Sequence, residues 1–308
     1  MLDPAELYEV AADAPEFDGP VLLVALDGFV DAGNAARLAV AALLADRESQ
    51  PVATFDIDQL IDYRSRRPPL RFESDRWAGY TPPRLDLVAL TDTGDTPYLL
   101  LSGPEPDTQW ERFTAAVAQL VEQLGVRLVI NLTAIPMAVP HTRPIGVTAH
   151  GTRPELTEGH EAWFAGADVP GSAVALMEFR LGEAGHDAMG FAVHVPHYLA
   201  RAEYPQAARV LLDHVGLAAG LYLPTEGLSK AALRSDGEIG EQVAASEEVK
   251  QVVEALERQY DAVASGRGER STLGLGGELP SADELGAEVE KFLAAQNDDE
   301  EDGENGHS

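Results

Sequence analysis

The sequence of 308 residues contains no cysteine, and this absence excludes several kinds of site at once. A chain without cysteine has no disulfides, no thiolate metal ligands and no cysteine nucleophile. Basic residues are also scarce, since 22 Lys and Arg stand against 52 Asp and Glu and give a formal net charge of −30. Because Lys and Arg are what hold nucleic acids and anionic membranes, the sequence predicts neither as a partner.

Long apolar runs are missing too. The longest, such as Val21–Leu26, have the length of a strand and fall well short of the roughly 18 residues of a membrane helix. The first residues, Met1–Glu6, have neither the basic nor the apolar region of a signal peptide. We therefore expect a cytoplasmic protein. Hydrophobic residues still make up 45% of the chain, which is enough for a sizeable core.

Strand-like and helix-like segments alternate along the first two thirds of the chain. The apolar pattern predicts strands at 21–26, 52–57, 98–102, 127–132, 146–149 and 189–195. It predicts helices at 35–45, 110–124, 172–181 and 204–217, and Thr108 and Glu111 have the spacing of a capping box before the second of these. This alternation favours an α/β protein whose sheet is largely parallel and covered by helices on both faces.

The strand pattern ends at Pro224. An apolar seam from Val249 to Val263 predicts a helix that begins after Ser246, and a second capping box at Ser281 and Glu284 predicts another helix that runs past Phe292. We expect these helices to form a hairpin on the α/β body. The predicted division is an α/β/α domain at 1–223, a C-terminal helical segment at 224–296, and a disordered acidic tail at 297–308.

Six short segments stand out among the predicted elements: Asp27–Asn34, Ser102–Asp107, Ile135–Pro144, Val169–Ser172, His194–Tyr198 and Pro280–Leu285. In order and spacing they resemble a bacterial member of the proteasome assembly chaperone family, second type, over roughly residues 18–295. The resemblance implies a three-layer α/β/α body of the phosphorylase/hydrolase-like kind with a helical C-terminal appendage. It also implies self-association, and we expect a homo-oligomer, with a trimer favoured over a dimer.

Loops that follow parallel strands open at the same edge of a sheet, where α/β proteins bind ligands. The loops that begin at Asp27, Gly103 and Thr133 all follow predicted strands, so we expect their side chains to share one cleft. The candidate catalytic residues are Asp27, Asp31 and His141, and the candidate binding residues are Asn34, Glu105, Asp107 and Arg143.

Each candidate has a structural alternative. Asp27 and Asp31 can act as paired carboxylates, one raising the pKa of the other, or Asp31 can cap the next helix while Asp27 holds its loop by backbone hydrogen bonds. His141 and Arg143 lie between two prolines, which suits anion binding or an ion pair that fixes the loop. The carboxylates at 105 and 107 can likewise fix their loop and cap the helix that follows.

We predict neither a metal nor a cofactor. His194 and His197 are three residues apart, which on a strand directs their side chains to opposite faces, and no third ligand accompanies them. The basic cluster at Arg64, Arg66, Arg67, Arg71 and Arg76 can grip a phosphate or an acidic partner, but we favour a solvated loop that pairs with the protein's own surface. The leading functional hypothesis is a self-associating protein-binding or assembly protein with a protein partner. The alternative is a small-molecule hydrolase or transferase that works in the cleft.

Overall fold

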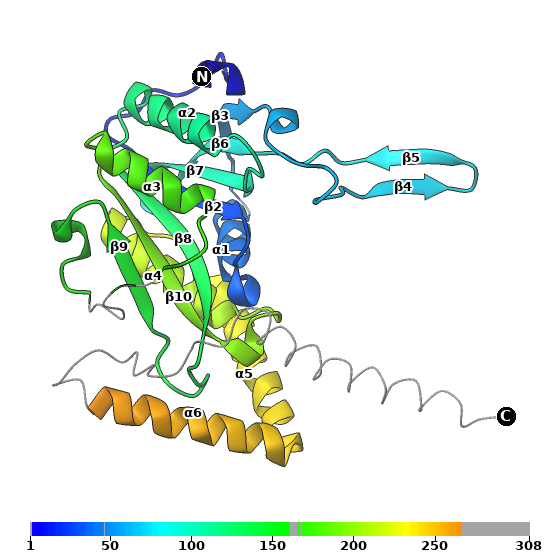
Figure 1. The fold of residues 1–308 in the computed structure, drawn as a ribbon, viewed down its shortest axis with the longest axis vertical. Helices are drawn as coiled ribbons and strands as arrows, with labels where there is room; N and C mark the ends of the chain where they lie inside the picture. The colour runs from blue at the N-terminus through cyan, green and yellow to red at the C-terminus, as the bar shows by residue number, and fades with distance from the viewer. Residues whose placement is uncertain (1, 46, 161–165, 167, 266–308) are drawn as a thin grey trace.

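The computed structural model describes residues 2–45, 47–160, 166 and 168–265, which form a mixed eight-stranded sheet between two layers of helices (Figure 1). The strand order across the sheet is β1 (Tyr8–Val10), β3 (Gln50–Phe55), β6 (Asp86–Thr91), β7 (Pro97–Pro104), β2 (Val21–Asp27), β8 (Leu128–Met137), β10 (Ala188–Pro196) and β9 (Val147–Gly151). The predicted α/β class with helices on both faces is confirmed.

The sheet is parallel only at its centre. Strands β7, β2, β8 and β10 are parallel neighbours, whereas β6, β3, β1 and β9 pair antiparallel. The prediction of a largely parallel sheet is therefore wrong at both edges. On one side the reason is local, because the short turn Asp92–Thr96 joins β6 directly to β7 and leaves no room for a crossover helix.

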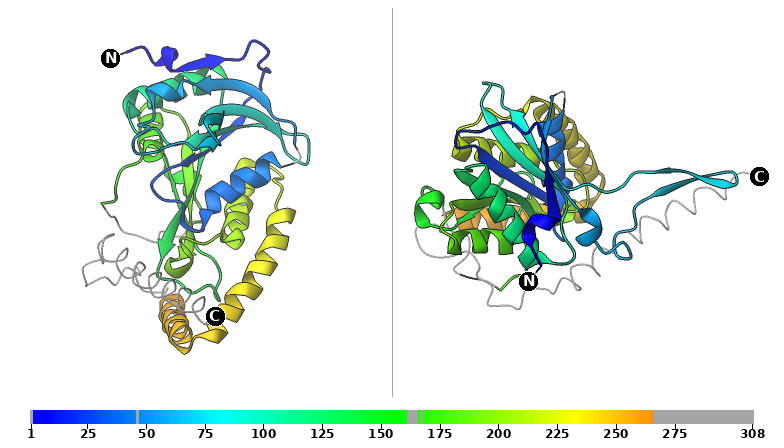
Figure 2. Two further views of the ribbon diagram at one scale, coloured as in Figure 1. Left: turned by 90° about the vertical axis from the view of Figure 1, so that its right-hand side faces the viewer. Right: turned by 90° about the horizontal axis from the view of Figure 1, so that it is seen from above.

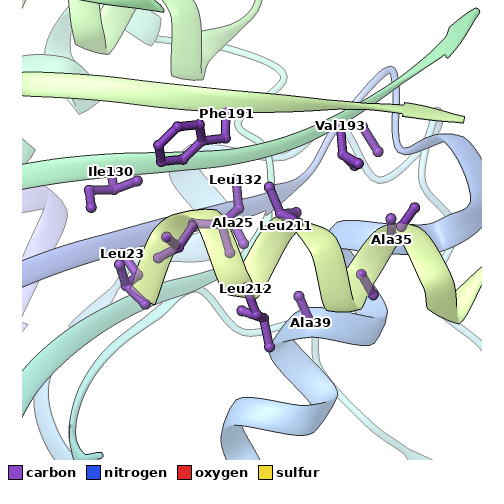
Figure 3. Packing of buried hydrophobic residues seen from close by; sticks show 14 of the residues in the cluster. Leu23, Ala25, Ala35, Ala39, Ile130, Leu132, Phe191, Val193, Leu211 and Leu212 are labelled. Atoms are coloured by element: carbon purple, nitrogen blue, oxygen red, sulfur yellow. The ribbon is translucent and has the colours of Figure 1, made fainter. Parts of the chain in front are cut away.

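One face of the sheet is covered by α1 (Ala35–Leu44), α4 (Pro205–Ala219) and α5 (Glu226–Ala245), as the left view of Figure 2 shows. Strand residues that alternate along β2, β8 and β10 point toward these helices, and Figure 3 shows Phe191 and Leu132 facing Leu211 of α4. Small residues at Ala35 and Ala39 let α1 approach the strands closely.

The opposite face is covered by α2 (Trp110–Gln123) and α3 (Ala173–Glu183), which pack on the other set of alternating residues. Because β2 is buried on both faces, its sequence is a continuous apolar run, as predicted. The predicted capping box of α2 is wrong. The N-cap is Gln109, the hydroxyl of Thr108 donates to the carbonyl of Gln59 at 3.3 Å, and Glu111 pairs with Arg180.

The C-terminal helices are α5 and α6 (Glu247–Ser265), which crosses beneath the body in Figure 1. The predicted start of α6 is confirmed, since the hydroxyl of Ser246 accepts the backbone N–H of Val249 at 3.3 Å. Helix α5 was not predicted, and the predicted helix at 281–293 and the acidic tail lie outside the described residues. None of the described helices combines the length and apolarity needed to cross a bilayer.

A two-stranded hairpin, β4 (Leu70–Glu73) and β5 (Arg76–Tyr80), projects away from the body (Figure 1). We call residues 66–84 the arm. The prediction of a loop is wrong for this segment, because about half of its residues form two paired strands. Short 3₁₀ turns complete the described chain: η1 (Pro4–Leu7), η2 (Ala32–Asn34), η3 (Ile57–Gln59), η4 (Pro154–Thr157) and η5 (His197–Leu199).

Candidate functional site

Three loops meet at one edge of the sheet, as predicted. Strands β2, β7 and β8 are parallel, so the chain leaves all three at the same edge. Asp31 forms an isolated parallel bridge with Ala134, and the backbone N–H of Glu105 donates to the carbonyl of Asp27 at 3.1 Å. The loop at 27–34 is thus joined to both of its neighbours. The third loop begins later than expected, because β8 continues to Met137.

Asp31 holds the start of α1. Its carboxylate accepts the backbone N–H groups of Ala36 and Arg37 at 2.8 and 3.0 Å. Burial raises the pKa of Asp31, although these two donors oppose the rise. Asn34 adopts the left-handed conformation, with φ of 50°, and its side chain makes no capping bond. Both oxygens of Asp31 are therefore used by the helix.

Asp27 is placed differently. Among the described residues, no hydrogen bond or ion pair reaches its carboxylate, and only its backbone carbonyl is used, by Glu105 and by Arg66 at 2.7 Å. Partial burial raises the pKa of Asp27, and the positive charges of Arg37 and Arg66 oppose that rise. The carboxylate lines a cleft of about 370 Å³ between α1 and the strands β2, β7 and β6.

Glu105 links two elements of the scaffold. It is buried, and its carboxylate accepts the backbone N–H of Ala173 at 2.6 Å, at the N-terminus of α3. A side chain at residue 28 would collide with this carboxylate, so the glycine there is required by close packing. Glu105 fixes its own loop, as one alternative predicted, but it caps α3 and not α2.

Asp107 anchors the segment that leads into the arm. Its carboxylate accepts the backbone N–H of Asp62 at 2.8 Å and pairs with Arg66 at 3.1 Å. The helix that follows Asp107 begins at Gln109 without a side-chain cap. The expectation that this carboxylate caps α2 is therefore wrong, and its partners are 41 and 45 residues earlier in the chain.

The loop between Pro140 and Pro144 is tied to α6. Arg143 makes two hydrogen bonds to Asp261, at 2.8 and 2.7 Å, and a third to Glu257 at 3.2 Å. His141 contacts Tyr198 through both its backbone N–H and Nδ1. Among the described residues, none of these contacts reaches Asp27 or Asp31. The predicted residues therefore share a sheet edge but form two separate groups.

A polar network that the sequence did not predict runs from the buried Asn131 through Glu178 of α3 to the exposed His150. The side-chain amide of Asn131 donates to Glu178 at 2.8 Å, and the other oxygen of Glu178 lies 2.8 Å from Nδ1 of His150. Asn131, Gly190 and His150 are in register across β8, β10 and β9. The available signal was Gly190, a glycine in the middle of an apolar strand.

The described side chains around the cleft supply positioned charges. Within the part of the chain that the structure describes, no three His, Asp or Glu side chains converge as metal ligands. Ser102 and Ser49 line the cleft beside Asp27, yet no histidine does. What the site presents is an open carboxylate and arginine side chains around an apolar floor, which suits binding.

Comparison with solved structures identifies close relatives. A protein of unknown function from Mycobacterium tuberculosis, Rv2714, is 49% identical with a TM-score of 0.81, and covers 85% of this chain and 91% of its own. A protein of unknown function from Corynebacterium glutamicum is 40% identical with a TM-score of 0.80, covering 84% and 98%. Rv2125, a proteasome-assembly chaperone homologue from M. tuberculosis, is 27% identical with a TM-score of 0.69, covering 76% and 99%.

Curated proteins gave no match to the chain. The family comparison did, because the model of the PAC2 family matches residues 25–243, which contain the end of β2, the strands β7, β8 and β10, the arm and the three loops at the sheet edge. With this match and the identity to the two actinobacterial structures, the chain belongs to the PAC2 family.

Proposed function

We propose that the protein is a self-associating assembly protein that works through protein–protein contacts and forms a homotrimer. The single observation that carries this proposal is the arm. Similarity to Rv2125, a proteasome-assembly chaperone homologue, supports the assembly role. Membership of the PAC2 family also supports an assembly role.

The arm exposes apolar side chains that its own chain does not cover. Leu70, Phe72, Trp77 and Tyr80 are 52, 56, 66 and 48% exposed. Phe72 and Trp77 stack edge to face with ring centres 5.1 Å apart, which is the hairpin's own apolar contact. A lone two-stranded hairpin is marginal in water, and clustered exposed aromatics mark interfaces. A protein surface that covers these side chains would stabilise the arm.

The arginines of the arm are not what attracts another protein surface to it. Each of the following pairs joins an arginine to a carboxylate near the arm: Arg64–Asp62, Arg66–Asp107, Arg71–Glu73, Arg76–Asp75 and Arg84–Asp86. The basic cluster is therefore largely neutralised within the chain, as predicted. An apolar contact with another copy of the protein follows better from these pairs than an electrostatic contact with an acidic partner.

A projecting arm favours a closed ring. If the arm of one copy packs on a different surface of the next copy without a reciprocal exchange, the contact is heterologous, and such contacts form a ring when the rotation between copies closes. Three copies make the smallest such ring. The assembly then presents the same outer surface three times to a protein partner, which strengthens weak binding by multivalency.

Light scattering after size exclusion tests the proposal. The expected mass is three times the 32.9 kDa of the chain. Phe72→Ser with Trp77→Ser is expected to shift the mass toward the monomer. The matched control is Leu217→Ser with Tyr222→Ser, which removes two side chains that are 83 and 72% exposed away from the arm. A monomeric wild type, or an arm variant that stays as large as the control, would overturn the proposal.

The assembly role needs its own experiment. Purified proteasome α-subunits are mixed with the protein, and ring formation is followed by native gel and light scattering. The wild type is expected to bind the α-subunits or to speed ring formation. Absence of both effects, with the trimer intact, would reject the assembly role while leaving self-association standing.

A further inference from the structure

The cleft beside α1 is hollow because small side chains face each other across it. Ala25 of β2, Ser102 of β7 and Asp86 of β6 lie side by side in register on the face that α1 covers. Opposite them, α1 presents Ala36. Figure 2 shows α1 standing against this face of the sheet. The helix and the sheet therefore leave about 370 Å³ between them, which is within the range of ligand pockets.

Four of the described charged residues line the cleft. Two of them form an ion pair with each other, and the other two, which we call the unsatisfied pair, do not. Arg84 binds Asp86 through two hydrogen bonds, at 2.7 and 3.2 Å, so each neutralises the other. Asp27 has no partner for its carboxylate among the described residues. Within the part of the chain that the structure describes, the only ion pair of Arg37 is a 3.8 Å contact with the exposed Glu203. The unsatisfied pair thus consists of one negative and one positive group.

Asp27 and Arg37 are near each other but do not pair. Arg37 is close enough to counter the rise in the pKa of Asp27, yet no ion pair joins the two side chains. Asp27 is fixed at the end of β2, and Arg37 lies in the first turn of α1. The backbone N–H groups in that turn are already bound by Asp31, so an anion in the cleft must be held by the guanidinium.

The remaining lining is apolar. Val40, Leu44 and Val88 surround the space between the charged groups. A phosphorylated ligand is disfavoured, because Asp27 and Asp86 would repel its charge and Arg84 is already paired. A ligand that complements this cleft carries one positive end, one negative end and an apolar body.

We propose that the cleft binds a small zwitterion, namely a free amino acid or dipeptide with an apolar side chain. Its ammonium group binds Asp27, its carboxylate binds Arg37, and its side chain packs on Val40, Leu44 and Val88. This site touches only the base of the arm, where Arg84 lines the cleft, and it goes beyond the self-association proposed above. It makes the protein a binder of a small molecule as well as of protein surfaces.

Calorimetric titration with defined probes tests this site on the full chain. The probes are L-leucine, L-leucyl-L-leucine, N-acetyl-L-leucine, which lacks the ammonium group, and L-leucinamide, which lacks the carboxylate. Leucine or the dipeptide is expected to bind, and whichever is tighter names the ligand size. Each blocked form is expected to bind about tenfold more weakly than leucine, since each loses a charged hydrogen bond.

Variants assign each end of the ligand to one residue. In Asp27→Asn, leucine and N-acetyl-L-leucine are expected to bind equally weakly, while L-leucinamide still binds more weakly than leucine. In Arg37→Gln, the preference for leucine over L-leucinamide is expected to vanish instead. The control is Arg209→Gln, which removes an exposed arginine of α4 that pairs with Asp213 outside the cleft.

Two results would overturn the zwitterion site. One is the absence of binding by both zwitterions up to about 10 mM, the range where even weak ligands register. The other is binding whose dependence on the ammonium and carboxylate groups is unchanged in Asp27→Asn and Arg37→Gln. Circular dichroism confirms that the variants fold, and the trimer mass, measured in parallel, separates failure of this site from failure of self-association.

Discussion

The hydroxyl of Tyr198 makes two hydrogen bonds with His141: it accepts the backbone N–H at 2.8 Å and lies 2.7 Å from Nδ1. A hydroxyl that accepts the amide proton can still donate its own proton, and Nδ1 is the acceptor within reach. We therefore expect His141 to carry its proton on Nε2. Burial lowers the pKa of His141 and raises the pKa of Tyr198 to about 12, so both groups are neutral at pH 7.

The first prediction concerns this pair. By NMR, His141 is expected to be the Nε2–H tautomer and to titrate below the ordinary imidazole value of about 6.5. Since its pKa is lower in the folded state, the unfolded chain takes up the proton first as pH falls. The contribution of His141 to stability is thus complete above about pH 6.5 and is lost as pH falls toward the folded pKa.

Tyr198→Phe tests the cause. It leaves the His141 amide without its acceptor and is expected to lower the free energy of unfolding by about 1–2 kcal/mol. It should also release the tautomer preference. Tyr222→Phe, on an exposed ring, is the control and should change neither property. An Nδ1–H tautomer in the wild type would contradict the assignment.

The second prediction concerns Asp92 in the turn between β6 and β7. Its carboxylate is buried and accepts the backbone N–H groups of Gly94, Thr96 and Tyr222 at 2.7, 2.8 and 2.8 Å. Burial alone would raise the pKa of Asp92, but these donors outweigh it and lower the pKa. The ionised carboxylate of Asp92 therefore stabilises the folded state above about pH 4, and this stabilisation is lost as pH falls through the folded pKa.

Asp92→Asn places an amide NH₂ against one of these N–H donors, and we expect the free energy of unfolding to fall by about 2 kcal/mol. Urea denaturation at pH 7 measures this change. Asp95→Asn in the same turn is the control, because Asp95 is left-handed with φ of 63°, a conformation that asparagine tolerates. Equal effects of the two substitutions would show that the three bonds to Asp92 are not what holds the turn.

The third prediction concerns Gly190. A Cβ at this position would lie 2.7 Å from Nε2 of His150 and 3.1 Å from the Cβ of Asn131. Gly190→Ala should therefore displace the imidazole from Glu178 and lower the free energy of unfolding by about 1–3 kcal/mol. Gly237→Ala on α5 is the control, since nothing lies within 4 Å of it and alanine favours the helix.

A double-mutant cycle shows whether the collision is the cause. If the added methyl group displaces His150, then Gly190→Ala should be milder in a His150→Ala background, with a coupling of at least about 0.5 kcal/mol. Additive effects would mean that Asn131 or the strand backbone, and not the imidazole, requires a glycine here.

The fourth prediction concerns Arg143, which joins the Pro140–Pro144 loop to α6. In Arg143→Gln, amide hydrogen exchange in α6 is expected to speed up while the midpoint of global thermal unfolding changes little, because the bonds lost are local to the helix. About 1 M salt should weaken the wild-type contact in the same direction. If exchange in α6 instead matches the Arg209→Gln control, other contacts hold the helix, among them the hydrogen bond from Tyr260 to the carbonyl of Pro144.

Much of the fold was predictable because buried segments have a clear pattern of apolar residues in the sequence. The run Val21–Leu26 is buried on both faces of the sheet, and Asp31 occupies a position from which a carboxylate can cap a helix. The shared sheet edge followed from strand direction alone. These features depend on residues close in sequence or on the general geometry of parallel strands.

Other features could not be predicted, because local sequence patterns do not reveal the contacts on which they depend. The arm is exposed on both faces, and its strands are only four and five residues long, so the alternation at Leu70–Glu73 is too short to predict a hairpin. Helix α5 buries Leu228, Ala232 and Ile239, but Gly227, Gly237 and Gly240 weaken its helical signal. The Pro140–Pro144 loop is bound to α6, about 115 residues later in the chain, and no local pattern predicts that contact.

The arm is an insertion in the connection between two strands, and the pairing of those strands does not require it. It lies between β3 and β6, which are already antiparallel neighbours with Thr54 opposite Asp86. At its base, Arg66 is bound to Asp107 and Arg84 to Asp86, so the two ends of the insertion are each fixed to the body. A short turn in place of residues 67–83 would leave every strand pairing of the eight-stranded sheet intact. Related proteins can therefore gain, lose or exchange this insertion as a module, and subunit specificity can evolve without any change in the core.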